Sequence, residues 1–175
     1  MGLNELINKI APKAQKQAED AQKKSLMTMD YVKGNEGYKS KVYDDTENIQ
    51  TIGYGFNLED ETTRSLLPND VVSGKRDLTR EEADGAFSKR FQIAVNDAIS
   101  YMGGQDNFGQ LSDSQQKGLI DMSYNLGLTR LNKFVELRKR LYEGDKLGAK
   151  TEILNSKYAT QLPGRALKNA NLMLK

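Results

Sequence analysis

The stretch EGYKSKVYDDTENIQTIGYG, residues 36–55, is the most informative part of the chain. It combines two acidic side chains with a short segment rich in strand and turn residues. Glu36 opens the stretch, and Asp45 stands just before a polar loop. The pair Thr51–Ile52 follows that loop and leads into a Gly-Tyr-Gly segment. β-Branched and aromatic residues favour strands, and glycines allow tight turns. The pattern predicts a small antiparallel sheet over residues 41–58.

The two carboxylates are therefore expected on different elements that a tight hairpin joins. Cleavage of a glycosidic bond needs such a pair, because one acid protonates the leaving oxygen while the other activates water or stabilises the sugar cation. A glutamate at a helix end is common on protein surfaces, so Glu36 alone would not indicate catalysis. The spacing of Glu36 from Asp45 and Thr51 changes that interpretation, because it resembles the spacing in a known family.

Three pieces of this stretch resemble the phage-type lysozymes, the muramidases of glycoside hydrolase family 24. That family has a Glu-Gly after the first helix of its domain, an Asp in a Tyr-x-Asp-Thr hairpin and a Thr-Ile-Gly-x-Gly strand. The matching pieces here are Glu36–Gly37, Tyr43–Thr46 and Thr51–Gly55, and the spacing agrees without a gap. Asp44 competes with Asp45 for the role of second acid, but only Asp45 fits the spacing.

The resemblance implies an endolysin-type muramidase that hydrolyses the β-1,4 bond between N-acetylmuramic acid and N-acetylglucosamine in peptidoglycan. Glu36 would be the general acid. Asp45 and Thr51 would hold the attacking water, with inversion at the anomeric carbon. The alternative is a non-catalytic virion or cell-wall protein that keeps the same fold and uses its cleft only to bind glycan, because a fold does not determine a function.

The tail at residues 161–166, QLPGRA, resembles the family's Gln-x-Pro-x-Arg-Ala, in which the arginine pairs with the catalytic glutamate. Pro163 predicts a helix start, which places Arg165 in the first turn. A cation there opposes the helix dipole, so Arg165 is expected to have a carboxylate partner elsewhere. Glu36 is the candidate partner, and Arg165 would position the acid.

Four other residues are candidate contacts for the sugar chain. Tyr124 and Asn125 lie in a segment that resembles the family's aromatic-Gln-x-Gly at the cleft wall. For both of them a purely structural role, as a helix-end cap or a half-buried tyrosine, is an equally good interpretation. Gly55 lacks a side chain and so lets a sugar or another backbone approach closely. Asn57 is the fourth candidate.

Helix signals dominate the rest of the chain. The segment Thr79–Glu82 is a capping box that starts a long helix, and Ser112 with Gln115 is a second one. The resemblance implies a mainly helical α+β fold, in which a long helix joins a small lobe with a short antiparallel sheet to a larger all-α lobe. The lysozyme-like catalytic domain would span residues 26–175, with the β-containing lobe at about 36–78 and the helical lobe at about 79–175.

Apolar spacing predicts which helix faces are buried. Leu26, Met29 and Val32 recur at helical spacing, so all three are expected to face a core, and Gly34 is expected to end their helix. A later core-forming helix is predicted from a second apolar set: Leu147, Ile153 and Leu154.

Residues 1–25 are predicted to be a helical extension that the family's core does not need. Pro12 is expected to interrupt it and to begin a second helical segment. Two interpretations of this extension stay open. It is either a weakly ordered arm or processing remnant, or a tether to a larger assembly.

The composition excludes several chemistries. The 175-residue chain contains no histidine and no cysteine, so disulfides, His- or Cys-ligated metals and Ser-His or Cys-His nucleophiles are excluded. We expect no metal and no cofactor. No apolar run reaches membrane-spanning length, and the N-terminal sequence shows no secretory signal, so we expect no stable membrane insertion.

The protein is therefore expected to be made in the host cytoplasm and to act on the cell wall. That route requires a holin-type export partner or attachment to a virion through residues 1–25.

The charge of the chain is unevenly distributed: residues 130–175 carry a net charge of +7, whereas the whole chain carries +2. This basic surface is either simply solvated or attracted to an anionic polymer of the wall. No motif supports binding of nucleic acid.

Overall fold

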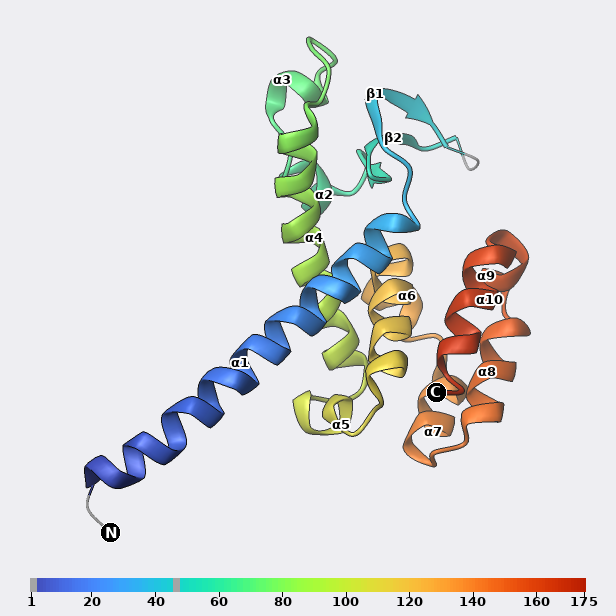
Figure 1. Ribbon diagram of the computed structural model, residues 1–175. Coiled ribbons are helices and arrows are strands. Elements are labelled where there is room, and N and C mark those ends of the chain that lie inside the picture. Colours follow the sequence, from blue (N-terminus) through green and yellow to red (C-terminus); the bar gives the residue numbers. More distant parts are fainter. Residues whose placement is uncertain (1–2, 46–47) are drawn as a thin grey trace.

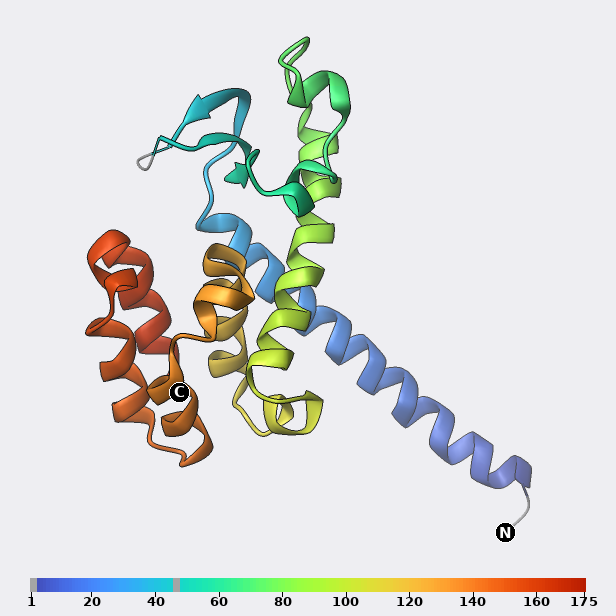
Figure 2. The ribbon, with the colours of Figure 1, turned by 180° about the vertical axis from the view of Figure 1, so that it is seen from behind.

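The computed structural model describes residues 3–45 and 48–175, so Thr46 of the hairpin motif lies outside the described part. Figure 1 shows a small sheet and two short helices at one end of the long helix α4, with the other helices grouped around its opposite half. The view from behind, Figure 2, shows the same two groups. This arrangement confirms the predicted fold class, which is α+β and mainly helical.

The elements follow one another in this order: α1 Leu3–Gly34, β1 Lys39–Asp44, β2 Gln50–Gly53, β3 Phe56–Asn57, α2 Glu61–Arg64, α3 Asn69–Val72, α4 Arg80–Tyr101, α5 Gln105–Gly109, α6 Asp113–Leu131, α7 Val135–Tyr142, α8 Lys146–Leu154, α9 Lys157–Gln161 and α10 Pro163–Leu172. None of the described helices is both long and apolar enough to span a membrane.

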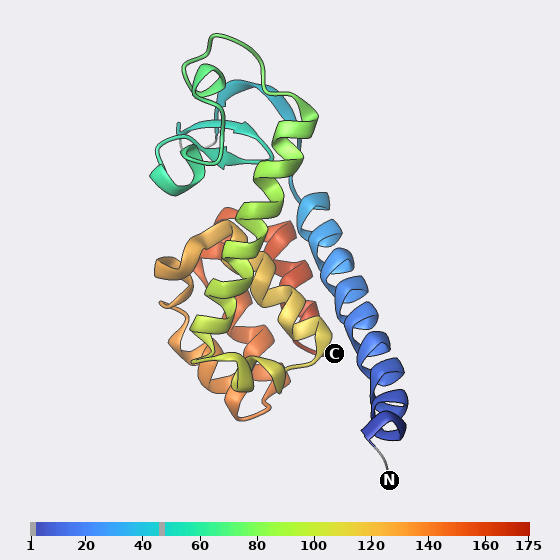
Figure 3. The ribbon, with the colours of Figure 1, turned by 90° about the vertical axis from the view of Figure 1, so that its left-hand side faces the viewer.

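Helix α1 is continuous, so the predicted interruption at Pro12 is wrong. Proline removes one N–H donor but keeps a φ angle that suits a helix. The N-terminal half of α1 extends away from the body of the molecule (Figures 1 and 2), and Figure 3 shows α1 running along one side of it.

The C-terminal half of α1 packs against the domain, but through a different face than predicted. Thr28 and Val32 are buried one helical turn apart, and Met29 packs beside them. Leu26 is 49% exposed, so its predicted place in the core is wrong. It lies six residues before Val32, and 3.6 residues per turn direct such a residue to another face. The predicted helix end at Gly34 is confirmed.

The three strands form an antiparallel sheet in the order β1-β2-β3, as predicted. Tyr43 lies opposite Thr51, and Thr51 in turn lies opposite Asn57. An irregularity interrupts the pairing between Lys39 and Tyr43. The central strand β2 thus places Thr51 between two partner strands, where its side chain is buried.

The long helix α4 begins with the predicted capping box. The Thr79 side chain accepts a bond from the Glu82 backbone, and the Glu82 side chain accepts one from the Thr79 backbone. Aromatic rings connect α4 to the sheet and to α6: Phe87 lies 5.5 Å from Tyr54 and 5.1 Å from Tyr124, centroid to centroid. This cluster holds the small lobe against the helices that carry the rest of the site.

Helix α6 also begins with its predicted capping box, formed by Ser112 and Gln115. Its backbone leaves the helical conformation at Gly127, where φ is 70° and ψ is 163°, and helical structure resumes up to Leu131. Gly127 therefore marks a break within α6. A positive φ of this kind is strained for residues with a Cβ, which explains a glycine at this position.

The last helices close the helical lobe. Pro163 occupies the first turn of α10, as predicted, and Arg165 follows it. In α8 the buried residues are Ala149 and Ile153, one turn apart, whereas Leu147 and Leu154 are exposed. The prediction that these two leucines belong to the core is wrong, because the packed face of α8 runs through the smaller Ala149.

Candidate active site

Glu36 lies just beyond the C-terminus of α1, and its backbone N–H donates to the carbonyl of Lys33 at 3.1 Å. Its side chain is 14% exposed. One carboxylate oxygen, Oε1, accepts a hydrogen bond of 2.6 Å from Nη1 of Arg165. The contact expected from the sequence is therefore present between residues at the two ends of the domain.

The other carboxylate oxygen of Glu36 faces the turn between β2 and β3. A Cβ added at Gly55 would lie 2.9 Å from Glu36 Oε2. Gly55 also has a φ of 73°, a conformation that residues with a side chain rarely adopt. Both observations explain why a glycine stands here: the turn bends sharply, and its backbone passes close to the carboxylate.

Arg165 binds a second carboxylate that the sequence interpretation missed. Its Nε donates to Asp121 Oδ2 and its Nη2 to Asp121 Oδ1, each at 2.9 Å. Asp121 lies on α6 and is fully buried. The signal was an aspartate inside the apolar run Gly118–Met122, because an ionised side chain is rarely buried without a partner.

Two amides complete the surroundings of Asp121. Asn169 Nδ2 donates to Oδ2 at 2.6 Å, and Asn35 Nδ2 donates to Oδ1 at 3.1 Å. Asn169 in turn accepts from the hydroxyl of Tyr31 at 3.1 Å and donates to the hydroxyl of Tyr158 at 3.0 Å. Residues of α1, α6, α9 and α10 thus form one polar network directly behind Glu36.

Opposing effects act on the proton affinity of Glu36, and the net result is a raised pKa. Burial is the largest effect and disfavours the charged carboxylate. Arg165 lowers the pKa through its charge and its hydrogen bond, the charge of Asp121 raises it, and Arg90 on α4 lowers it. A raised pKa is the property that a carboxylic acid needs to act as a proton donor near neutral pH.

The second predicted acid is anchored to the hairpin by short-range bonds. The backbone N–H of Asp45 donates to the carbonyl of Ile49 at 3.0 Å, and the Ile49 N–H donates to Asp45 Oδ1 at 3.0 Å. The hydroxyl of Thr51 donates to the same Ile49 carbonyl at 3.0 Å. One peptide segment therefore brings together the side chains of Asp45 and Thr51.

Tyr43 connects the hairpin to Glu36. It lies opposite Thr51 in the sheet, and its pKa is raised by burial, then by the negative charge of Glu36 and then by that of Asp45. Its phenol is therefore within electrostatic range of both carboxylates. Asp45 and Thr51 lie at the hairpin that joins β1 and β2, whereas Glu36 lies beside the β2–β3 turn. Tyr43 is a neighbour of both carboxylates that the sequence interpretation did not select.

The predicted sugar contacts receive less support. Tyr124 is buried in the aromatic cluster, and its hydroxyl donates to the carbonyl of Tyr54 at 3.4 Å. Its position is that of a core residue. Asn57 Oδ1 accepts from the backbone N–H of Glu59 at 2.7 Å, which fixes the chain after β3. Asn125 is half-buried near the break in α6, and its predicted role stays a prediction.

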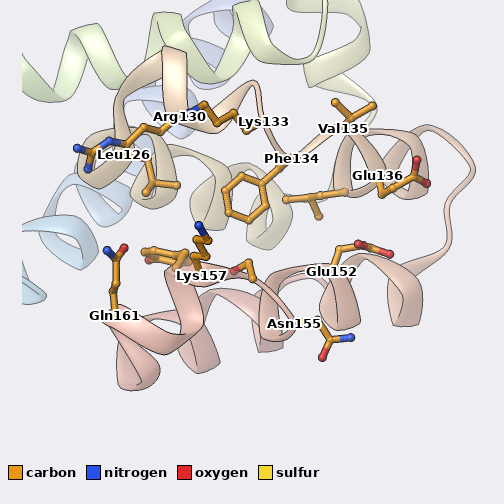
Figure 4. A pocket seen from close by; sticks show the side chains of 13 residues that line it. Leu126, Arg130, Lys133, Phe134, Val135, Glu136, Glu152, Asn155, Lys157 and Gln161 are labelled. Atoms are coloured by element: carbon orange, nitrogen blue, oxygen red, sulfur yellow. The ribbon is translucent and has the colours of Figure 1, made fainter.

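Cavities do not single out this site. A hollow of about 490 Å³ is lined by Glu36 together with residues of α1, the segment before β1, the β2–β3 turn and the start of α4. A cavity of about 510 Å³ lies instead within the helical lobe (Figure 4). Its lining combines apolar groups such as Phe134 with cations, among them Arg130, Lys133 and Lys157, and it includes none of the predicted catalytic residues.

No metal site is evident in residues 3–45 and 48–175: nowhere among them do three or more Asp or Glu side chains gather as metal ligands would. The arrangement can perform acid–base chemistry with its carboxylates. One is buried with a raised pKa, and the other is held on a hairpin by backbone bonds. Two carboxylates with different environments are what glycoside hydrolases use for catalysis.

The comparison with protein families agrees with this class. The family model described as phage lysozyme matches residues 33–170, so the chain belongs to the phage lysozyme family. It is a glycoside hydrolase of the lysozyme kind, with a muramidase-type function, and family membership implies peptidoglycan as the substrate.

Individual relatives are more distant. A protein named "Probable T4-type lysozyme 2" from Dictyostelium discoideum is 25% identical over 148 residues, which cover 78% of this chain and 87% of the relative. "Probable T4-type lysozyme 1" from the same organism is 26% identical over the same shares of both chains. "Pre-baseplate central spike protein Gp5" from Enterobacteria phage T4 is 24% identical over 86% of this chain, but only 28% of that protein is matched.

Proposed function

We propose that the protein hydrolyses the β-1,4 bond between N-acetylmuramic acid and N-acetylglucosamine in peptidoglycan, with Glu36 as the general acid and with Asp45 and Thr51 holding the attacking water. One observation carries the proposal. A buried glutamate with a raised pKa lies close to a hairpin on which an aspartate and a threonine share one backbone anchor, the Ile49 peptide.

The acid step follows from the two oxygens of Glu36. Oε1 is occupied by the 2.6 Å bond from Arg165, whereas Oε2 faces the exposed Gly55. A protonated carboxyl group retains an acceptor oxygen, so Glu36 can keep the Arg165 bond on Oε1 while Oε2 carries the proton. Oε2 would then donate this proton to the leaving glycosidic oxygen as the bond breaks.

The water step belongs to the hairpin. The Asp45 carboxylate would accept a proton from the attacking water, and the Thr51 hydroxyl would help to orient that water. The bond from Ile49 N–H leaves Asp45 with further acceptor capacity, because an ionised carboxylate has about four acceptor positions. Attack by a water held opposite the leaving group inverts the anomeric carbon. NMR detection of the first-formed anomer of the product tests this stereochemistry.

The test of the catalytic roles is the clearing of a peptidoglycan suspension. Glu36→Gln and Asp45→Asn should each slow clearing by at least about a hundredfold, in the range that positioned acids and bases contribute. Asp44→Asn is the matched control, because it removes the neighbouring, exposed carboxylate of the same strand end. Equal clearing by all variants would refute the assignment, and a loss confined to Asp44→Asn would move the role to Asp44.

The biological setting is a second part of the proposal. We infer that residues 1–25 attach the enzyme to a larger assembly, because the N-terminal half of α1 extends away from the body (Figure 1) and a relative is a baseplate spike protein. Deletion of residues 1–20 should leave clearing unchanged and abolish co-sedimentation with phage particles; retained co-sedimentation would refute attachment. Export by a holin-type partner and synthesis in the host cytoplasm stay predictions.

A further inference from the structure

We propose that Asp121 is a positioning residue for the acid: it holds Arg165 through two bonds and balances the positive charge, so that Glu36 gains an arginine partner without being fixed in its ionised form. This inference rests on the proposed acid role of Glu36. It assigns a function to a fully buried carboxylate that the hydrolytic steps themselves do not use.

The geometry of Arg165 supports the assignment. The guanidinium gives Asp121 two bonds of 2.9 Å in the fork arrangement and gives Glu36 one bond of 2.6 Å. A bidentate pair fixes the plane of the guanidinium. Arg165 therefore presents Nη1 to Glu36 in one fixed direction and cannot turn to form a second, symmetric pair with the acid.

The surroundings of Asp121 indicate an ionised carboxylate. It accepts hydrogen bonds from Arg165, Asn35 and Asn169, so its oxygens act as acceptors in all four of these bonds. An ionised carboxylate is acceptor-only, which matches four donors converging on two oxygens. Since these donors come from α10 and from Asn35, just after α1, the charge of Asp121 is held in place independently of Glu36.

The balance of charges gives the functional consequence. Arg165 alone beside Glu36 would form a one-to-one pair, and such a cation favours the ionised acid. With Asp121 present, the single positive charge of Arg165 lies between two carboxylates. The three groups together then carry one excess negative charge, and protonation of Glu36 removes it. Other groups also act on Glu36: Arg90 on α4 favours its ionised form, while the phenols of Tyr43 on β1 and Tyr124 on α6 lie within its electrostatic range.

The first experiment is the pH profile of kcat/KM for wild type and Asp121→Asn. The profile of the free enzyme falls at high pH where its essential acid loses the proton. Asp121→Asn should move this fall to lower pH by about one unit or more, the size of shift that a nearby charge causes. At pH values above the wild-type midpoint the rate should drop about tenfold, whereas the low-pH plateau should change much less.

A matched control and a double variant separate charge from structure. Asp113→Asn removes an exposed carboxylate at the start of the same helix and should leave the profile unchanged. The double variant Asp121→Asn/Arg165→Gln removes both charges, so burial and the weaker effect of Arg90 remain at Glu36 and the fall should move back to higher pH than in the single variant. A purely structural role for Asp121 predicts no such reversal.

A second readout does not depend on activity. Carbon-13 NMR titration of the Glu36 carboxyl, assigned with Glu36→Gln, should give a lower midpoint in Asp121→Asn than in wild type. Equal midpoints would overturn the inference. Failure of the proposed function is a different result, because Glu36→Gln would then clear peptidoglycan as well as wild type does, whatever the titration shows.

Wild type alone provides the test if Asp121→Asn does not fold. The Arg165 Nε–H faces Asp121, whereas Nη1 faces Glu36. The Nε–H resonance should therefore stay slowly exchanging and unshifted through the titration of Glu36, while the Nη1 resonance follows it. An Nε–H signal that is lost when Glu36 becomes protonated would show that Arg165 does not stay with Asp121, and would overturn the inference.

Discussion

The two sides of the site are built in different ways. On the arginine side, defined by Glu36, Arg165 and Asp121, charged side chains from separate elements meet in a nearly closed interior. On the hairpin side, defined by Asp45, Ile49 and Thr51, neighbouring residues of one hairpin are tied to each other through the backbone of Ile49. One side depends on buried charge, and the other depends on local geometry.

The difference follows from what each side has to do. An acid near neutral pH needs a raised pKa, and burial with an adjusted balance of charges provides it. A water-holding pair needs oxygens in fixed positions, and hydrogen bonds within a hairpin provide them. We therefore expect substitutions on the arginine side to change stability and pH dependence strongly, and substitutions on the hairpin side to change activity with little effect on stability.

The largest expected effect is that of Arg165→Met. It leaves the buried carboxylate of Asp121 without its ionic partner, and breaking a buried pair in this way typically costs about 3–5 kcal/mol. Urea unfolding measures the change in the free energy of unfolding. Lys168→Met is the control, because Lys168 is exposed and makes one bond of 2.9 Å, to Asn35. A cost below about 1 kcal/mol for Arg165→Met would contradict the buried-charge account.

A smaller effect is expected where the two sides meet, at Gly55. Gly55→Ala adds a Cβ at a φ of 73° and directs it at Glu36 Oε2, only 2.9 Å away. The backbone strain should cost about 1–2 kcal/mol, and displacement of Glu36 should reduce clearing of peptidoglycan. Gly74→Ala is a close control, because φ is 70° there and the added Cβ meets nothing within 4 Å.

The comparison of the two variants separates strain from contact. Both should lose similar stability in urea unfolding, because both place alanine in the left-handed region. Only Gly55→Ala should lose activity beyond what its stability explains. Equal activity of the two variants would mean that Glu36 Oε2 has room to move, and the proposed proton donor would then be less tightly positioned than the contact indicates.

The hairpin side should respond weakly in stability. Thr51→Val removes the bond to the Ile49 carbonyl, a neutral hydrogen bond whose net contribution is about 1 kcal/mol. The carbonyl keeps its bond from the Asp45 N–H, so no buried acceptor is left without a partner. Thr151→Val is the control, since its hydroxyl bonds the Leu147 carbonyl at 2.9 Å on an exposed helix face. Thr51→Val should slow clearing while Thr151→Val should not; equal rates would exclude Thr51 from the water site.

The hairpin side was also the part that the sequence predicted best, for a physical reason. Its contacts join residues within one hairpin, so spacing and strand preference determine them directly. The capping boxes at Thr79 and Ser112 and the helix start at Pro163 are predictable in the same way. Local bonds depend on a few consecutive residues, and those residues are visible in the chain.

The arginine side could be predicted only in part. The Glu36–Arg165 contact joins residues 129 positions apart. It was expected from the family resemblance and because Arg165, a cation in the first turn of a helix, opposes the helix dipole and so needs a carboxylate partner. The bond from Arg165 to Asp121 spans 44 positions and left only one local signal, an acid within an apolar run. The predicted burial of Leu26 and Leu147 was wrong for a similar reason. The sequence shows that a side chain is apolar, but the packing of the whole domain decides which helix face is buried.

The last expected effect concerns pH, and it distinguishes the two sides without any loss of fold. Glu36 has a raised pKa in the folded protein, so between its ordinary pKa and the raised value the folded state holds a proton that the unfolded state has released. The folded state then binds more protons, and the free energy of unfolding falls as pH rises through this window. Below this pH window the contribution of protonated Glu36 to the free energy of unfolding is fully present, and above the window this contribution is lost.

Glu36→Gln cannot titrate, so its stability lacks this decline. The difference in unfolding free energy between wild type and Glu36→Gln should therefore decrease as pH rises through the window, by about 1.4 kcal/mol for each unit by which the pKa is raised. Urea unfolding at a series of pH values measures it. The same difference for Thr51→Val should be constant, because a hydroxyl does not titrate in this range. A constant difference for Glu36→Gln as well would mean that burial and Arg165 cancel at Glu36, and the contrast between a charge-based side and a geometry-based side would not hold.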